Sequence, residues 1–411
     1  MKRFTALILA AALLASGCSV QKVEETTAAA TEAVTTAAAA EETEGAAEET
    51  GESAYDALET VNIGLVASQS GSNKTIGQFV INGVELAIEE INANGGVLGK
   101  QLSLVIEDEG ENSQSAVNAT QKLLARDDIS AIMGPTTSSY CLAVSPFVLE
   151  HEIPFMAGGS SANIPLEQNP YVWQNRMTDD QSGLIMARAC VDVLGIKNPA
   201  IIYSTESFGT GLKDQTVAAL SEMGVEVDEN NIYGFNADER QFQPILTQIL
   251  NSDVDGLIAA CHTNPASLIV VQANDVGLEL PCIGSNAFSS IVCREAAKEL
   301  ADGWYSITDW TENGQEGRGK EFAEAYRAKY GEESDLVSVS AYDQVYILAN
   351  AIETAGSADP QKINDALGQI SDFDGAMSVY TYHDTHCLAT SQLLTVNEDT
   401  LSVLVEKISI D

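Results

Sequence analysis

The chain has 411 residues, of which 45% are hydrophobic and 19% are charged, which is enough for two domains that each bury a core. It carries 60 acidic residues against 20 Lys and Arg, a formal net charge of −40. A charge of this sign repels phosphate groups, so we expect no nucleic-acid partner and no docking of a basic face on anionic lipid.

The first 18 residues are typical of a secretion signal. Met1-Lys2-Arg3 is a short basic start, residues 4–14 are apolar, and the small residues 15–17 precede Cys18. An apolar run of about a dozen residues is too short to span a hydrocarbon core of about 30 Å. The ending resembles a bacterial lipobox, in which Cys18 becomes the lipidated first residue of the mature chain. A plain cleaved signal that happens to contain Cys18 is the alternative.

Residues 19–60 predict a disordered acidic linker. They are rich in Ala, Thr and Glu, and no aromatic residue appears before Tyr55. Such a segment cannot bury a core, and its charges keep it extended. We therefore expect a lipid anchor, a linker and a folded body outside the cytoplasm.

The other cysteines and the histidines give no metal site. Six cysteines remain, none of them in a CxxC pair: Cys141, Cys190, Cys261, Cys282, Cys293 and Cys387. Outside the cytoplasm they could pair in 15 ways, but most lie in apolar runs, which favours buried free thiols. His383 and His386 fit a turn between strands better than a metal site. We expect no metal and no cofactor.

Strand-like and helix-like segments alternate from residue 61 onward. The expected strands of the first half are 61–67, 102–107, 129–133 and 153–157, and the helices are 77–92, 113–126 and 139–150. After a break at 163–175, strands at 200–204, 225–233, 255–261 and 281–284 alternate with helices at 211–223, 240–250, 265–276 and 290–300. Helices at 317–330, 338–355 and 361–370 and strand-like runs at 378–382 and 391–396 follow. The pattern predicts an α/β fold of two doubly wound parallel-sheet lobes.

Two loops that follow neighbouring strands are candidate binding loops. Residues 134–139 read Gly-Pro-Thr-Thr-Ser-Ser, and residues 158–161 read Gly-Gly-Ser-Ser. Hydroxyl groups and backbone N–H groups at a helix N-terminus suit an anion such as a carboxylate, although either loop alone could be a helix cap. No nucleophile elbow, Walker loop or HExxH motif is present, so we expect a binding protein and not an enzyme.

Several motifs together resemble the periplasmic Leu/Ile/Val-binding proteins of ABC importers. The similarity covers essentially all of 61–390, and its motifs are residues 68–71, 82–99 with Asn94-Gly95-Gly96, 134–139, 153–161, 207–211 and 341–344. The resemblance implies a type 1 periplasmic-binding-protein fold, whose two lobes are joined by three crossings and close on the ligand. Lobe 1 would be 61–178 plus 309–385, and lobe 2 would be 179–308 plus 386–411.

The resemblance also implies a ligand site. Ser138 and Ser161 would hold the ligand carboxylate, with backbone help near Gly159. Phe208, His262 and Ile76 fall where the family commonly has aromatic residues. Asn286 falls where the family commonly has the Glu that pairs with the α-ammonium, so either Glu206 or Asp309 pairs with the ammonium instead, or the ligand is not a free α-amino acid.

The function implied is an extracytoplasmic solute-binding lipoprotein. It would bind a branched-chain or other apolar or small amino acid and deliver it to the permease subunits of an ABC importer. We expect a monomer that touches the membrane only through its lipid anchor. The alternative is a sensor component for an amide or small carboxylate.

Overall fold

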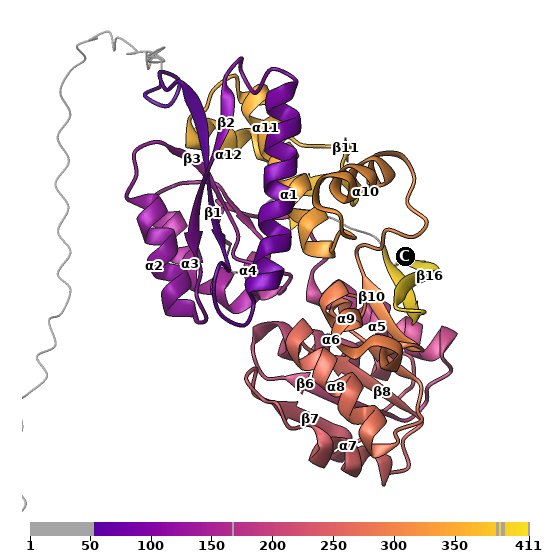
Figure 1. The fold of residues 1–411 in the computed structure, drawn as a ribbon. Coiled ribbons are helices and arrows are strands. Elements are labelled where there is room, and N and C mark those ends of the chain that lie inside the picture. The colour runs from indigo at the N-terminus through magenta and orange to yellow at the C-terminus, as the bar shows by residue number, and fades with distance from the viewer. Residues whose placement is uncertain (1–52, 167, 384–385, 388–390, 410–411) are drawn as a thin grey trace, which may run out of the picture. The chain divides into compact units, whose positions relative to one another are not determined.

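The computed structural model describes residues 53–166, 168–383, 386–387 and 391–409 (Figure 1). The expected signal, Cys18 and residues 19–52 of the expected linker lie outside these residues. Residues 53–59, also expected in the linker, contact the folded body: the Asp56 carboxylate accepts hydrogen bonds from the Ser357 hydroxyl and the Ala358 N–H group. Among the described residues, no helix is long and apolar enough to cross a membrane.

The first lobe is built on a sheet with the strand order β13-β14-β5-β4-β3-β1-β2. Its strands are β1 (Thr60–Ala67), β2 (Gln101–Asp108), β3 (Ile129–Met133), β4 (Phe155–Ala157), β5 (Val172–Gln174), β13 (Tyr382–His383) and β14 (His386–Cys387). Its helices are α1 (Lys74–Ala93), α2 (Ser113–Leu124), α3 (Ser138–Glu150), α4 (Asn163–Leu166), α10 (Gly317–Tyr330), α11 (Leu336–Ala355) and α12 (Pro360–Leu367). Every neighbouring pair is parallel except β13 with β14.

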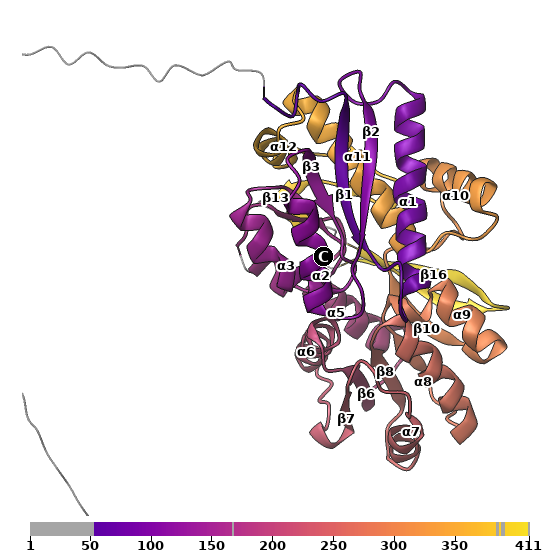
Figure 2. The same ribbon diagram turned by 60° about the vertical axis from the view of Figure 1, so that its left-hand side comes forward.

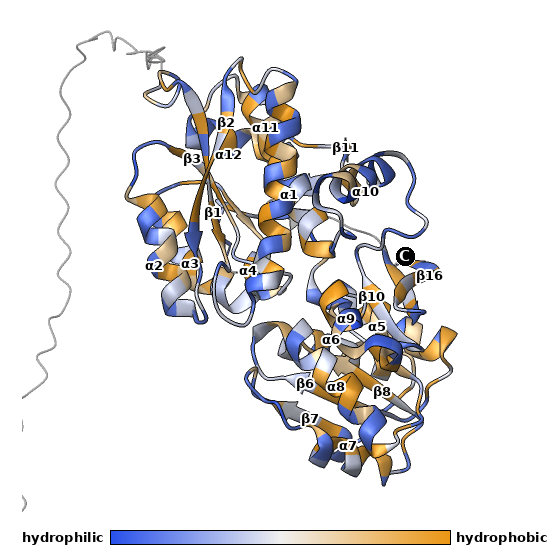
Figure 3. Ribbon diagram, in the orientation of Figure 1, coloured by the Kyte–Doolittle hydropathy of each residue, from blue (hydrophilic) through white to orange (hydrophobic). Residues whose placement is uncertain are grey.

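Helices cover both faces of this sheet because the strands alternate their side chains. Ile63 and Leu65 of β1 join one hydrophobic cluster with α1 and α11, whereas Val66 joins another with α2 and α3. Figures 1 and 2 show α1 and α11 on one side of the sheet and α2 and α3 on the other. The outer helices carry both polar and apolar residues along their length (Figure 3), as helices with one solvent-facing side do.

The second lobe repeats the same plan. Its sheet has the order β16-β15-β10-β9-β8-β6-β7, in which β7-β6-β8-β9-β10 matches β2-β1-β3-β4-β5 of the first lobe. Its strands are β6 (Pro199–Ser204), β7 (Ile232–Phe235), β8 (Gly256–Ala260), β9 (Cys282–Gly284), β10 (Trp304–Thr308), β15 (Ser391–Glu398) and β16 (Leu401–Ser409). Its α-helices are α5 (Asp179–Arg188), α6 (Ser207–Glu222), α7 (Gln243–Leu250), α8 (Thr263–Val276) and α9 (Ile291–Ala297).

Five shorter elements complete the description. A π-helical turn, Ala189–Val193, continues α5, and 3-10 turns lie at Glu229–Asn231, Asn286–Phe288 and Lys298–Ala301. The strands β11 (Phe373–Asp374) and β12 (Val379–Tyr380) form a separate two-stranded sheet.

The chain passes between the two sheets three times, after β5, after β10 and after β14. β14 belongs to the first sheet, because His386 pairs with Gln174 of β5, so that sheet extends past the boundary expected at 385. The antiparallel pairs β10–β15 and β15–β16 then add a hairpin to an otherwise parallel second sheet.

The alternation predicted most of the helices and strands but missed β5, α5, β10 and β16. β5 and α5 lie in or just after the stretch expected to be a break, and β10 and β16 were not expected. The expected strand 225–233 forms regular pairing only from Ile232, and the expected strand 153–157 begins at Phe155. Pro154 explains the late start of β4, because proline has no N–H group for the ladder.

The described cysteines are buried free thiols. Cys141, Cys190, Cys261, Cys282 and Cys293 form no disulfide. Burial raises the pKa of the Cys141 thiol to about 12, so it stays protonated and unreactive at neutral pH. The side chain of Cys387 lies outside the described residues.

The close approach of α1 and α11 gives a test of the packing. A Cβ added to Gly83 would lie 2.0 Å from the backbone carbonyl oxygen of Ser338, so we expect Gly83→Ala to lower the free energy of unfolding by about 1–3 kcal/mol. At a helical position with open space around it, the same Gly→Ala change would instead raise the free energy of unfolding by up to about 1 kcal/mol. The control is Gly368→Ala, since Gly368 has an αR backbone and no atom closer than 3.6 Å to its added Cβ. Chemical denaturation of both variants measures the difference, and equal stabilities would contradict the packing.

Candidate functional site

A cavity of about 480 Å³ lies between the two lobes. Its walls come from the loops at the carboxyl ends of the strands, where helices begin. Five of the expected site residues line it: Ile76, Ser138, Phe208, His262 and Asn286. The position agrees with the general rule that open parallel sheets bind ligands beyond the carboxyl ends of their strands.

Ser138 and its neighbours form an uncapped helix end at this cavity. Ser138 is the first residue of α3, and no side chain caps that helix. Residues 136–140 line the cavity, so the free N–H groups of the first turn lie beside it. The backbone N–H group of Ser161 donates to the Ser138 Oγ atom at 3.1 Å. A Cβ on Gly159 would lie 2.8 Å from the Ser138 Cα atom, so glycine there permits the close approach of the two loops.

Ser161 faces a second, adjoining cavity of about 340 Å³. Its Oγ atom lies 3.0 Å from the Ser207 Oγ atom of the other lobe, and the Ser207 N–H group donates to the Ser139 Oγ atom at 3.4 Å. These contacts join the lobes between the two cavities. The two expected serines are therefore neighbours, but only Ser138 lines the larger cavity.

Glu206 is the N-cap residue of α6 and lines both cavities. Its carboxylate accepts hydrogen bonds from the N–H groups of Phe208 and Gly209. Its Oε1 atom lies 3.5 Å from the His262 Nε2 atom. Burial alone would raise the pKa of Glu206, but the charge and hydrogen bond of His262 and the donors around the carboxylate lower it to about 2. Glu206 is therefore ionised at neutral pH.

Phe208 and His262 form the stacked part of the cavity wall. Their ring centroids are 4.8 Å apart and their planes are inclined by 26°. Burial acts to lower the pKa of His262, but the charge and hydrogen bonding of Glu206, together with Asp179, raise that pKa. His262 keeps 39% of its side chain exposed, so it can respond to a ligand in the cavity.

Arg176 is a cavity residue that the sequence analysis did not identify. It lies in the first crossing, between β5 and α5, and its Nε atom donates to the Asp309 Oδ2 atom at 3.2 Å. Asp309 lies in the second crossing. It accepts a further hydrogen bond at 2.6 Å from the Nε2 atom of Gln392, which lies at the end of the third crossing. Asp309 is not among the residues that line the cavity, and its carboxylate is held in these contacts.

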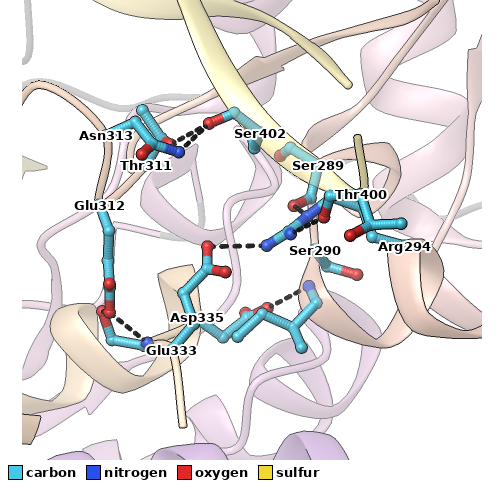
Figure 4. Close-up of polar contacts among 12 residues, drawn as sticks. Ser289, Ser290, Arg294, Thr311, Glu312, Asn313, Glu333, Asp335, Thr400 and Ser402 are labelled. Atoms are coloured by element: carbon cyan, nitrogen blue, oxygen red, sulfur yellow. Dashed lines mark hydrogen bonds and ion pairs between the residues drawn. The ribbon is translucent and has the colours of Figure 1, made fainter. Parts of the chain in front are cut away.

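Beside the cavity, Arg294 joins the two lobes (Figure 4). Its Nη2 atom donates to the Glu333 Oε1 atom at 2.8 Å, and its other donors bond to the carbonyl oxygens of Ser289 and Thr400. The nearby Asp335 lies at the start of α11 in lobe 1. Its carboxylate accepts a hydrogen bond from the backbone N–H group of Ile291 in lobe 2. These bonds fix the wall that carries Asn286 and Asp335.

Asp179 lines the second cavity and is almost completely buried. Its Oδ2 atom has no hydrogen-bond partner among the described residues. Burial raises the pKa of Asp179 to about 8, with the negative charge of Glu206 acting in the same direction and Ser160 and Arg176 opposing it. No group of described His, Cys, Asp and Glu side chains could hold a metal ion.

The chain is similar in sequence to proteins of known family. A family model described as periplasmic binding protein matches residues 60–398. The chain is 26% identical to the Leu/Ile/Val-binding protein BraC3 of Rhizobium johnstonii over 334 residues, which cover 81% of this chain and 89% of the relative.

Two solved structures are similar in fold. The leucine binding protein LivK of Thermotoga maritima has a TM-score of 0.80 at 23% identity and covers 86% of this chain and 99% of that one. The branched-chain amino acid transporter substrate binding protein LivJ of Streptococcus pneumoniae, solved with isoleucine, has a TM-score of 0.76 at 24% identity and covers 85% and 99%. The expected resemblance and the expected fold are both confirmed.

The buried Asp179 predicts a measurable pH dependence of stability. Because its pKa is raised from 3.8 to about 8 in the folded protein, the native state holds a proton that the unfolded state releases above pH 4. The free energy of unfolding therefore falls as pH rises from about 4 to about 8. Asp179→Asn should make the fall in melting temperature between pH 5 and pH 8 smaller.

The control is Asp180→Asn, which changes the exposed neighbouring carboxylate. Other buried carboxyl groups with raised pKa values, such as Glu109, keep part of the pH dependence in every variant. If Asp179→Asn shows the same pH slope as the wild type and as Asp180→Asn, the buried proton is not on Asp179.

Proposed function

The chain belongs to the periplasmic binding protein family, and from this premise we propose that it captures an amino acid between its lobes for an ABC importer. Members of the family are solute-binding proteins and not enzymes. The observation that carries the proposal is the cavity that places the uncapped start of α3 and the charged Glu206 together. A helix N-terminus and a carboxylate are the two partners that a zwitterion requires.

The α-carboxylate of the ligand would bind at Ser138. The Ser138 hydroxyl and the free N–H groups at the start of α3 are donors, and the helix dipole adds positive potential there. Gly159 lets the second loop approach, and Ser161 fixes the Ser138 hydroxyl through its backbone N–H group. We therefore assign Ser138 a direct role and Ser161 a positioning role.

The α-ammonium would bind at Glu206. Asn286 lines the cavity but offers only an amide, and Asp309 is held by Arg176 and Gln392 outside the lining. Glu206 remains as an ionised carboxylate on the cavity wall, beside the aromatic face of Phe208. His262 shares that carboxylate, so an imidazolium and the ligand ammonium would compete for it.

Anchoring and delivery complete the proposal. Cys18 would carry the lipid, residues 19–52 would tether the body, and the loaded body would meet the permease subunits at the membrane. Relatives named Leu/Ile/Val-binding proteins support an amino-acid ligand.

The ligand assignment predicts a calorimetric result. A screen of leucine, valine, alanine and the polar amino acids should find binding that the corresponding amine-free acids lack. For the best ligand, Ser138→Ala with Ser161→Ala should weaken binding by a factor on the order of 10². Removing the Ser138 hydroxyl from a charged partner costs about 1.5–3 kcal/mol, and Ser161→Ala also removes the hydroxyl contact with Ser207 of the other lobe.

The control for the double variant is Ser221→Ala, which removes an exposed hydroxyl bonded to Glu226 outside the cavity. Near-native binding by the double variant would move the carboxylate site elsewhere. If the amine-free acids bind as tightly as the amino acids, the amino-acid assignment is wrong.

The anchor predicts a cellular result. Wild-type protein should partition with the membrane fraction, and Cys18→Ala should not, because it lacks the thiol that carries the lipid. Fractionation of expressing cells and detection in each fraction measures this. Equal retention of both proteins in the membrane fraction would refute the lipid anchor.

A further inference from the structure

Most of the residues that line the larger cavity carry polar groups. Of its 24 residues, five are purely apolar: Ile76, Phe208, Ala237, Pro265 and Val337. An apolar ligand side chain gains its binding energy by leaving water for an apolar wall, whereas unpaired polar groups on that wall would lose their solvation. The lining therefore offers partners for a polar ligand side chain beside its apolar surface.

Arg176 is a buried residue of that lining whose donors are only partly used. Its side chain is only 10% exposed, and its one hydrogen bond among the described residues joins Nε to Asp309. The four N–H donors on the Nη atoms have no partner there. Because Arg176 lines the cavity, these donors are available to a ligand.

The orientation of Arg176 is fixed before any ligand arrives. Asp309 holds the Nε side of the guanidinium, and Gln392 holds Asp309 from the other side. A guanidinium held on one edge presents its remaining donors as a planar fork, which matches the two oxygens of a carboxylate.

Two carboxylates of the same lining, Glu206 and Asp335, already have partners. Glu206 accepts two backbone N–H groups at the start of α6, and Asp335 accepts those of Ile291 and Val337 at the start of α11. Neither carboxylate is within the ion-pair distance of Arg176. Arg176 thus keeps its free donors for an incoming anion.

We propose that Arg176 binds a carboxylate on the side chain of the ligand, so that the captured solute is a dicarboxylic amino acid. This inference rests on the proposed function, in which Ser138 binds the α-carboxylate and Glu206 binds the α-ammonium. Arg176 is then the residue that selects the side chain, with Asn286 and Ser290 lining the same cavity as further donors.

The test is calorimetry of L-glutamate, L-aspartate, L-glutamine and L-leucine with the wild-type protein and with Arg176→Gln and Arg176→Lys. In the wild type, one of the two acidic amino acids should bind at least tenfold more tightly than glutamine and leucine. Arg176→Gln should weaken that binding by 10- to 100-fold and change glutamine binding by no more than a few-fold. Arg176→Lys should retain part of the preference, because it keeps the charge and loses the fork.

Two further variants separate recognition from folding. Arg126→Gln removes the arginine of an exposed ion pair with Asp128 and changes the net charge equally, so it should leave all affinities unchanged. Arg176→Gln combined with Asp309→Asn removes both members of the buried pair, and it should lose the acidic preference even if Arg176→Gln alone fails to fold.

The outcomes distinguish the two proposals. Tighter binding of leucine than of both acidic amino acids would overturn the role of Arg176 and leave the proposed function standing. If folded Arg176→Gln lost affinity for glutamate and for glutamine equally, the proposal would also be overturned, because Arg176 would then have only a structural role. Binding of no amino acid would overturn both.

Discussion

The Asp309 carboxylate is the contact on which the junction of the lobes depends. Asp309 lies in the second crossing between the lobes. Its carboxylate accepts hydrogen bonds from Arg176 in the first crossing and from Gln392 at the end of the third crossing. The side chains of Arg176 and Asp309 are about nine-tenths buried, so removing one partner would leave an uncompensated charge at the junction. The same bond directs the free edge of Arg176 toward the cavity. One ion pair thus serves both the connection of the lobes and the chemistry of the cavity between them.

The rest of the site follows from parallel sheets that carry helices on both faces. Each strand of such a sheet ends at the same edge, and the next helix begins there. Ser138 and Glu206 are accordingly found at or beside the starts of α3 and α6, whereas Asp335 precedes α11, which follows the helix α10. Two of these helix starts are capped by carboxylates, and the start of α3 is not capped by any side chain. The difference leaves one positive helix end open to an anion and places a fixed negative charge across the cavity from it.

Sequence patterns predicted what is local and missed what depends on the fold. The long amphipathic segments and the loops at 134–139 and 158–161 carry their own signals, so α1, α3 and the position of Ser138 were predictable. Arg176 follows β5, a strand of three residues in a stretch read as a break, so nothing local marked it as a cavity residue. Recognising Val172–Gln174 as a strand would have placed Arg176 at the same sheet edge as Ser138. The sequence suggests Asp309 as an ammonium partner, but its pairing with Arg176 joins residues 133 positions apart.

Capture of the proposed acidic solute by a strongly acidic protein must act at short range. Residues 61–411 carry 17 basic and 49 acidic residues, a net charge of −32, so the distant field repels an anion. Physiological salt screens that field beyond about 8 Å, and the charges on the outer surface therefore matter little once a ligand enters the cavity. Inside, the held guanidinium of Arg176 and the open end of α3 act at hydrogen-bond distance, where they are much less screened. The surface charge then limits the rate of encounter, and these fixed donors determine how long the ligand stays.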